Sequence, residues 1–149
     1  MNNQSTRRNF VKTGSTLTAG ALLASPYIAN AAKDDKIIKI GLVGIGGRGS
    51  GAAAQAMNAD PNVALTAIGD LFEDRIKLRS RILKARGRDK YQVTDDTTFI
   101  GFDAYKKVID SGVDVVILTT PPAFRPQHLE YAIKKGVHCF FEKPVAVDA

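Results

Sequence analysis

Short apolar, β-branched runs alternate along this chain with longer stretches of helical pattern. Because few polar positions interrupt these runs, they are typical of strands buried on both faces of a parallel sheet. The runs lie at residues 37–43, 63–68, 91–94, 113–118 and 137–141. Helices are expected between them, at 50–59, within 75–90, at 104–110 and at 126–135. This alternation predicts an α/β fold with a doubly wound parallel sheet of strand order 3-2-1-4-5.

Residues that commonly begin or end helices lie at most of these boundaries. Asp60-Pro61-Asn62 ends the first helix, and Ser111-Gly112 ends the third, which Asp103 can cap at its start. Gly136 follows the last helix as its C-terminal stop. The polar stretch 95–101 is interpreted as a connection without sheet pairing.

Three glycines follow the first expected strand at a characteristic spacing. Gly44, Gly46 and Gly49 fit G-x-G-x-x-G. In this pattern the first glycine allows a tight turn, the second lets a pyrophosphate approach the backbone, and the third lets the helix pack on the strand. The helix N-terminus adds unpaired N–H groups and the positive end of its dipole. The spacing alone also fits a turn without a ligand, but the surrounding strands and helix favour a dinucleotide site.

A carboxylate follows the second expected strand. Asp70 lies 21 residues beyond Gly49, close to the spacing at which an acid meets the adenosine ribose. It would accept hydrogen bonds from the ribose hydroxyls and repel the 2′-phosphate of NADP, which favours NAD. Arg75 lies near the same strand end and can accept a 2′-phosphate, so NADP remains an alternative.

Two further segments are expected at the carboxyl edge of the sheet. Thr119, Thr120, Pro121 and Pro122 form a stiff loop after the fourth strand, which should face the glycine loop across the crevice. The fifth strand delivers Glu142-Lys143-Pro144 to the same edge.

Together these motifs resemble the Gfo/Idh/MocA oxidoreductases, over the chain from about Lys36 to its end. Glu142-Lys143-Pro144 after the fifth strand is the most specific mark. The resemblance implies a Rossmann-type domain that binds NAD, and hydride transfer with a sugar, cyclitol or similar secondary alcohol. The residues expected to bind the cofactor are Gly44, Ile45, Gly46, Gly47, Arg48, Gly49, Asp70, Thr119, Thr120, Pro121, His128, Glu142 and Lys143.

The resemblance also implies roles for two residues of the Glu142-Lys143-Pro144 motif. The lysine matching Lys143 reaches the nicotinamide ribose and the reacting hydroxyl, and the glutamate matching Glu142 helps hold the ribose. The ammonium of Lys143 would lower the pKa of the hydroxyl and stabilise a developing alkoxide, which makes it the candidate catalytic residue. By position alone, Lys143 is equally a surface lysine before a turn proline.

Four other side chains carry plainer interpretations. His128 either touches the cofactor loop or packs against the two threonines, and Arg48 either contacts a phosphate oxygen or points to water. Cys139 lies in an apolar run and is expected to be a small core residue rather than a nucleophile. His138 is expected to be structural, since two histidines and one cysteine do not make a metal site.

Family members continue into an α/β substrate domain with a mostly antiparallel sheet, through which they form dimers. That domain also carries a further Asp or His pair for proton transfer. The chain stops at Ala149, so the sequence predicts a fragment or an incomplete gene product that turns nothing over alone. Oligomers are expected only through the missing domain. Two alternatives stay open: an NAD-dependent glycosidase that oxidises and re-reduces its substrate, and a non-catalytic nucleotide-binding module.

Residues 1–31 are expected to be a targeting segment that precedes a mature domain of residues 32–149. Arg7-Arg8, Phe10 and Lys12 resemble a twin-arginine export signal. The apolar stretch 17–28 is too short and interrupted for a membrane span, and Ala29-Asn30-Ala31 offers a cleavage site. This predicts export by the twin-arginine machinery to the periplasm or cell envelope; the alternative is a disordered basic tail.

The net charge of +6 falls to about +3 without this segment, which holds three basic residues and no acids. Basic residues are concentrated in 75–90, where Ile76, Leu78, Ile82 and Leu83 fit one helical face. The charges are then the solvated side of a helix. Nucleic-acid binding is not favoured, because no aromatic residues are interleaved among them.

Overall fold

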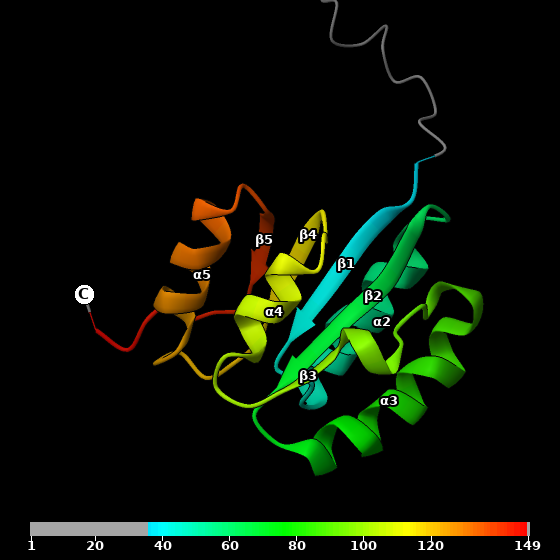
Figure 1. The fold of residues 1–149 in the computed structure, drawn as a ribbon, viewed down its shortest axis with the longest axis horizontal. Helices are drawn as coiled ribbons and strands as arrows, with labels where there is room; N and C mark the ends of the chain where they lie inside the picture. The colour runs from blue at the N-terminus through cyan, green and yellow to red at the C-terminus, as the bar shows by residue number, and fades with distance from the viewer. Residues whose placement is uncertain (1–35, 149) are drawn as a thin grey trace, which may run out of the picture. The chain divides into compact units, whose positions relative to one another are not determined.

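The computed structural model describes residues 36–148, so the predicted signal at 1–31 lies outside the described part of the chain. The described residues form a five-stranded parallel sheet of order β3-β2-β1-β4-β5 (Figure 1), which confirms the predicted topology. The strands are β1 (Ile38–Val43), β2 (Val63–Asp70), β3 (Thr98–Ile100), β4 (Val115–Leu118) and β5 (His138–Phe141).

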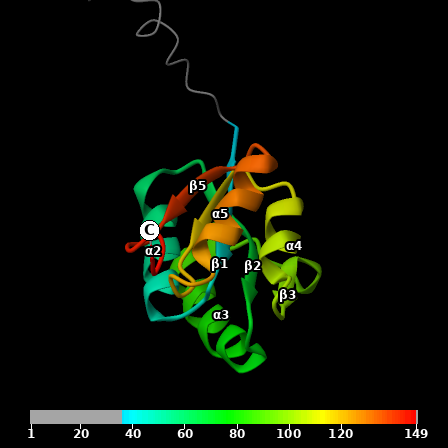
Figure 2. The ribbon, with the colours of Figure 1, turned by 90° about the vertical axis from the view of Figure 1, so that its left-hand side faces the viewer.

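Helices cover both faces of the sheet, as the doubly wound pattern predicted. Those on one face are α2 (Gly47–Ala59) and α3 (Glu73–Gly87), and those on the other are α4 (Ala104–Asp110) and α5 (Arg125–Lys134) (Figures 1 and 2). Side chains of β1 alternate between the two cores: Leu42 packs with α2 and α3, and Val43 packs with α4 and α5. In residues 36–148, no helix is both long and apolar enough to cross a bilayer.

The third strand is not where the sequence pattern placed it. β3 is Thr98–Ile100, inside the stretch predicted as a connection. Tyr91 makes only an isolated bridge to Leu65, and Tyr91 and Val93 pack against the core beside α2 and α3. The prediction of residues 91–94 was wrong because their apolar character reflects packing on that core rather than sheet pairing.

The four helices lie where the sequence predicted them, but some of their ends and buried positions differ from the prediction. α2 begins at Gly47 rather than Ser50, since the glycine turn passes directly into the helix. Leu78 was expected on the buried face of α3 but is 61% exposed. Asp103 does not cap α4 with its side chain; it pairs with Lys106 Nζ at 2.8 Å, and this partner lowers the pKa of the Asp103 carboxyl.

The predicted stop at Gly136 is confirmed. Its φ of +70° lies in the left-handed region, where glycine carries no steric penalty, and its N–H donates to the carbonyl of Ile133 at 3.0 Å.

Cys139 lies on β5, the strand that follows. It is half-buried against the core, and burial raises the pKa of its thiol. Both observations fit the small core residue predicted for this position.

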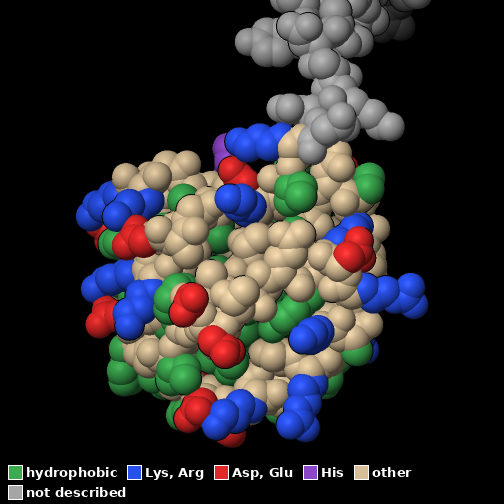
Figure 3. Space-filling model, turned by 45° about the vertical axis from the view of Figure 1, so that its right-hand side comes forward, with side chains coloured by type: hydrophobic (Ala, Val, Ile, Leu, Met, Phe, Trp, Pro, Cys, Tyr) green, Lys and Arg blue, Asp and Glu red, His purple; other side chains and the backbone are tan. Residues whose placement is uncertain are grey.

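Charged side chains are dispersed over the face that Figure 3 presents, where basic and acidic groups alternate with uncharged ones. On α3, Lys77 Nζ pairs with Glu73 at 2.6 Å, one helical turn apart. Exposed pairs of this kind contribute about 0.3–0.5 kcal/mol each, so the charges of this helix serve solvation more than stability.

Candidate functional site

The glycine turn after β1 has the geometry that the motif predicts. Gly44 has a φ of +90°, and its N–H donates to the carbonyl of Gly69 at 2.8 Å. A Cβ on Gly49 would overlap the Gly44 carbonyl oxygen and the Thr119 hydroxyl, so the third glycine is required by close packing. No atom lies within 4 Å of the position that a Cβ on Gly46 would take. The backbone at Gly46 is therefore open to a ligand, which is how a pyrophosphate would approach it.

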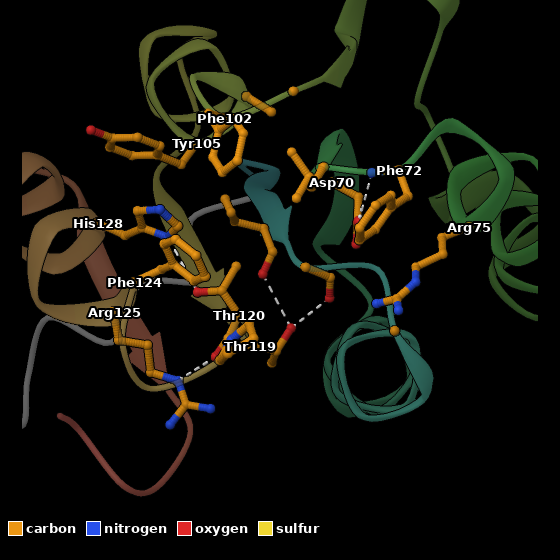
Figure 4. Close-up of a pocket in the computed structure, with 17 residues that line it drawn as sticks. Asp70, Phe72, Arg75, Phe102, Tyr105, Thr119, Thr120, Phe124, Arg125 and His128 are labelled. Atoms are coloured by element: carbon orange, nitrogen blue, oxygen red, sulfur yellow. Dashed lines mark hydrogen bonds between the residues drawn. The ribbon is translucent and has the colours of Figure 1, made fainter. Parts of the chain in front are cut away.

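The loop after β4 lies against this turn, as expected from the strand order. The hydroxyl of Thr119 donates to the Gly44 carbonyl at 2.6 Å and lies 3.1 Å from the Val43 carbonyl (Figure 4). These contacts join residues that are 75 and 76 positions apart in the chain. The two loops therefore form one continuous wall at the carboxyl edge of the sheet.

Asp70 is buried, with 8% of its surface exposed, and holds the same turn from the other side. Its Oδ2 accepts from the N–H of Ile45 at 2.8 Å, and its Oδ1 accepts from the N–H of Phe72 at 3.1 Å. The sequence pattern did not predict this role, in which the carboxylate binds the backbone of its own chain. Contact of Asp70 with a ribose stays a prediction.

A cavity of about 440 Å³ opens between the glycine turn, the end of β2, the loop after β4 and the start of α5. Such a volume suits a small-molecule ligand. Most of its wall is apolar and aromatic, and Asp70 is the one carboxylate that lines it among the described residues. Its lining includes Gly44, Gly46, Asp70, Phe72, Arg75, Phe102, Tyr105, Thr119, Thr120, Pro121, Phe124, Arg125 and His128 (Figure 4).

His128 is buried on α5 and faces this cavity. Its Nδ1 lies 3.2 Å from the Thr120 hydroxyl, and its ring stacks on Tyr105 with centroids 4.1 Å apart. Burial lowers the pKa of His128 to about 4, so the ring is neutral at pH 7. His128 therefore packs against Thr120, which is one of the two interpretations that the sequence allowed. Contact of His128 with a cofactor stays a prediction.

Arg48 has a partner that neither interpretation of it included. Its guanidinium forms an ion pair with Glu142, which joins the first turn of α2 to the segment after β5. The hydrogen bond from Arg48 is the main cause that lowers the pKa of the Glu142 carboxyl. In this structure, two residues expected to contact the cofactor contact each other.

Arg125 is a site residue that the sequence analysis missed. It is 6% exposed, and its Nε donates to the Thr120 carbonyl at 2.8 Å. Its Nη1 donates to the carbonyls of Glu142, at 2.6 Å, and Pro144. This guanidinium therefore fixes the Glu142–Pro144 segment against the loop after β4. The sequence contained no signal for it, because all three acceptors are main-chain oxygens.

Lys143 lies in that fixed segment with an exposed side chain. It does not line the cavity, but Arg125, which does, binds the residues on both sides of it. The structure thus brings the glycine turn, Asp70, residues 119–121 and His128 to one cavity and places Lys143 on a neighbouring segment. Within residues 36–148, no cluster of three or more potential metal ligands occurs.

The model of the Gfo/Idh/MocA family, described as oxidoreductases with an NAD-binding Rossmann fold, matches residues 38–149. This chain belongs to that family. Its sequence resemblance is thereby confirmed, and so are the Rossmann-type fold and NAD as the cofactor of the domain. The open backbone at Gly46 and the turn at Gly44 fit that cofactor.

Solved structures of similar fold include scyllo-inositol dehydrogenase from Lactobacillus casei, with bound NAD(H) and scyllo-inositol. The TM-score is 0.60 at 25% identity, over 76% of this chain and 30% of that one. An NAD-binding oxidoreductase from Klebsiella pneumoniae gives a TM-score of 0.57 at 26% identity, over 77% and 29% of the two chains.

Similar curated proteins carry another name. A glycosyl hydrolase family 109 protein from Solibacter usitatus is 28% identical over 96% of this chain and 34% of its own length. One from Porphyromonas gingivalis is 27% identical over 74% of this chain and 23% of its own length. The chain spans about a third or less of the length of these relatives.

Proposed function

We propose that this domain is the nucleotide-binding part of an oxidoreductase that transfers hydride between NAD(P) and a secondary alcohol of a carbohydrate-like substrate. The observation that carries the proposal is the cavity at the carboxyl edge of the sheet, with the Lys143 segment fixed beside it by Arg125. The inositol dehydrogenase of similar fold, which holds NAD(H) and scyllo-inositol, supports a polyol as the substrate class.

The chemistry assigned to this chain is electrostatic. NAD, when bound, accepts the hydride that leaves the carbinol carbon, and a proton must also leave the oxygen. An ammonium at Lys143 stabilises the negative charge that develops on that oxygen, provided that the charge is greater in the transition state than in the substrate. We assign the proton acceptor and the substrate pocket to a further domain of the kind that the family carries.

A glycosidase is the second candidate function, and the relatives named glycosyl hydrolase family 109 favour it. Such an enzyme would oxidise its substrate, eliminate and add at the sugar, and then reduce it again, so that NAD is returned unchanged. Product analysis separates the two functions. A dehydrogenase forms ketone and NADH in equal amounts, whereas the glycosidase forms free sugar with no net ketone.

The chain alone is expected to bind dinucleotide without turnover. Calorimetric titration of residues 32–149 with NAD should give a saturable site, because the glycine turn and its supports all lie within the described residues. Incubation with NAD and a panel of inositols and sugars should produce no NADH. Alcohol-dependent NADH formation would contradict the assignment of the proton acceptor to another domain, and absence of binding would contradict the site itself.

We further propose that residues 1–31 direct export by the twin-arginine route, on the pattern of Arg7-Arg8, Phe10 and Lys12. This route carries folded proteins, and compartments outside the cytoplasm hold no pool of free NAD. The cofactor would then travel bound to the protein. Retention over many turnovers requires slow release, which for ordinary association rates means a dissociation constant of about 1 μM or below.

This export proposal predicts that protein recovered from the cell envelope and dialysed still contains nucleotide, measured by absorbance and mass. Replacing both arginines with lysine (Arg7→Lys, Arg8→Lys) is the control, and it should leave the protein in the cytoplasm. Recovery of an empty protein that is active only with added NAD would contradict a retained cofactor. Export of the double variant would contradict the route.

A further inference from the structure

Arg125 occupies a position that is unfavourable for a cation. It is the first residue of α5, where the positive end of the helix dipole repels a positive charge. The residue is only 6% exposed, although its guanidinium stays charged at neutral pH. None of the ion pairs formed by residues 36–148 includes it. Burying such a charge costs stability, and departures from local preference of this kind are expected at functional sites.

Three main-chain oxygens bind this guanidinium in place of a carboxylate. They are the carbonyls of Thr120, Glu142 and Pro144. Hydrogen bonds from a charged donor are about twice as strong as those between neutral groups. Moving the 142–144 segment away would leave a buried cation without two of its acceptors, which is more costly than the loss of a neutral hydrogen bond. The main chain on both sides of Lys143 is therefore held firmly, whereas its side chain stays exposed.

The same turn of α5 also holds the loop after β4. Nε of Arg125 donates to the Thr120 carbonyl at 2.8 Å, and Nδ1 of His128 lies 3.2 Å from the Thr120 hydroxyl (Figure 4). Thr120 lines the cavity. The start of α5 thus joins a wall of the cavity to the segment that carries Lys143. The position of Lys143 relative to the cavity therefore depends on Arg125.

A second side-chain contact holds this segment less firmly. Sheet pairing ends just before Lys143, where the N–H of Glu142 donates to the carbonyl of Leu118 at 3.2 Å. Arg48 pairs with the Glu142 carboxylate, but the side chain of Arg48 is 53% exposed. Water and salt screen an ion pair at such exposure. The contacts of Arg125 are shielded from solvent and bind the main chain directly, so we expect them to decide where Lys143 lies.

We propose that Arg125 is the positioning residue for Lys143: its guanidinium, held by the Thr120 carbonyl, fixes the main chain around Lys143 and so directs the ammonium to the reacting oxygen. This inference rests on the proposed function, in which Lys143 stabilises charge on that oxygen. The planar guanidinium is needed as well as its charge, because a lysine ammonium is a point charge without the rigid fork of donors that spans the two segments.

The chain itself tests the positioning step. The backbone order parameter of Lys143, measured by NMR relaxation, should be about 0.85, the value of rigid backbone. Arg125→Lys keeps the charge without the planar donors, and it should lower this value below about 0.6, as in a flexible segment. The order parameters of β1 should stay unchanged, and thermal unfolding checks that the fold is kept.

Two further variants complete this measurement. Arg86→Lys makes the same change in the exposed last turn of α3 and should leave the order parameter of Lys143 unchanged. Arg125→Met removes the buried charge altogether and serves where Arg125→Lys does not fold, because an apolar side chain tolerates burial. The same loss of order at Lys143 is expected of it.

Turnover tests the functional step, in a protein that joins this domain to a substrate domain. Arg125→Lys should lower kcat about 10-fold to 100-fold, because a displaced ammonium stabilises the developing charge less well. The KM of the substrate and the dissociation constant of NAD should change less than about 3-fold. The double variant Arg125→Lys, Lys143→Met should be no slower than Lys143→Met alone, since Arg125 acts through Lys143.

Three results would overturn the proposal. The first is a Lys143 amide that stays rigid in both Arg125 variants, and the second is an unchanged kcat in Arg125→Lys. The third is a double variant whose kcat falls by the product of the two single effects, which would make Arg125 a structural residue independent of Lys143. Failure of the proposed function gives a different result, in which the unmutated longer protein forms no product with NAD although the Lys143 amide is rigid in the chain. This inference then fails with it.

Discussion

Lys143→Met is expected to lower kcat about 100-fold or more in a protein that joins this domain to a substrate domain, while the affinity for NAD changes little. The reason is that the ammonium is assigned to charge that develops on the substrate oxygen in the transition state. Methionine keeps the unbranched chain as far as the ε position and removes the ammonium group, with its charge and its hydrogen-bond donors. The measurement is steady-state turnover together with calorimetric titration of NAD.

Lys84→Met is the matched control for this variant. Lys84 is also an exposed lysine, but it lies on α3, away from the Glu142–Pro144 segment, and its loss should leave turnover unchanged. Unchanged turnover in Lys143→Met would make Lys143 an ordinary surface lysine before a proline. A loss confined to NAD affinity would instead place Lys143 at the cofactor alone.

Gly49→Ala is expected to abolish dinucleotide binding and to destabilise the domain by about 3 kcal/mol or more, which is the upper range for overpacking in a rigid site. The added Cβ would overlap a backbone oxygen of Gly44 and the hydroxyl of Thr119. Those two groups are themselves hydrogen-bonded at 2.6 Å, so neither can move without opening the wall of the cavity. Denaturant unfolding and titration with NAD measure the two effects.

Gly51→Ala, two residues along the same helix, is its control. No atom lies within 4 Å of the Cβ position at Gly51, so the methyl group has room. Replacing a helical glycine with alanine is expected to stabilise by up to about 1 kcal/mol, with NAD affinity unchanged. Equal behaviour of the two variants would show that the close approach at Gly49 does not govern the turn.

The order of the strands and the site of phosphate approach were predictable from the sequence alone. The apolar run at residues 113–118, in which β4 (Val115–Leu118) forms, is typical of a strand buried on both faces of a parallel sheet. The glycines at 44 and 49 were predictable because their positions require a left-handed φ and a close contact, and both demands restrict the residue type locally. The positive φ of Gly44 and the approach of Gly49 to the Gly44 carbonyl both arise within the glycine turn itself, so the spacing of the glycines reveals them.

The tertiary structure alone decided which polar groups meet. The partners of Asp70, the ion pair of Arg48 with Glu142 and the buried contacts of Arg125 depend on how distant segments are placed side by side by the sheet. Main-chain donors and acceptors occur at nearly every residue, so no sequence pattern identifies the one that a side chain will bind. Residues 91–94 were mistaken for a strand for a related reason. An apolar pattern records that residues are buried, and only the packing determines whether they pair in a sheet or lie on the core as an irregular segment, as Tyr91 does.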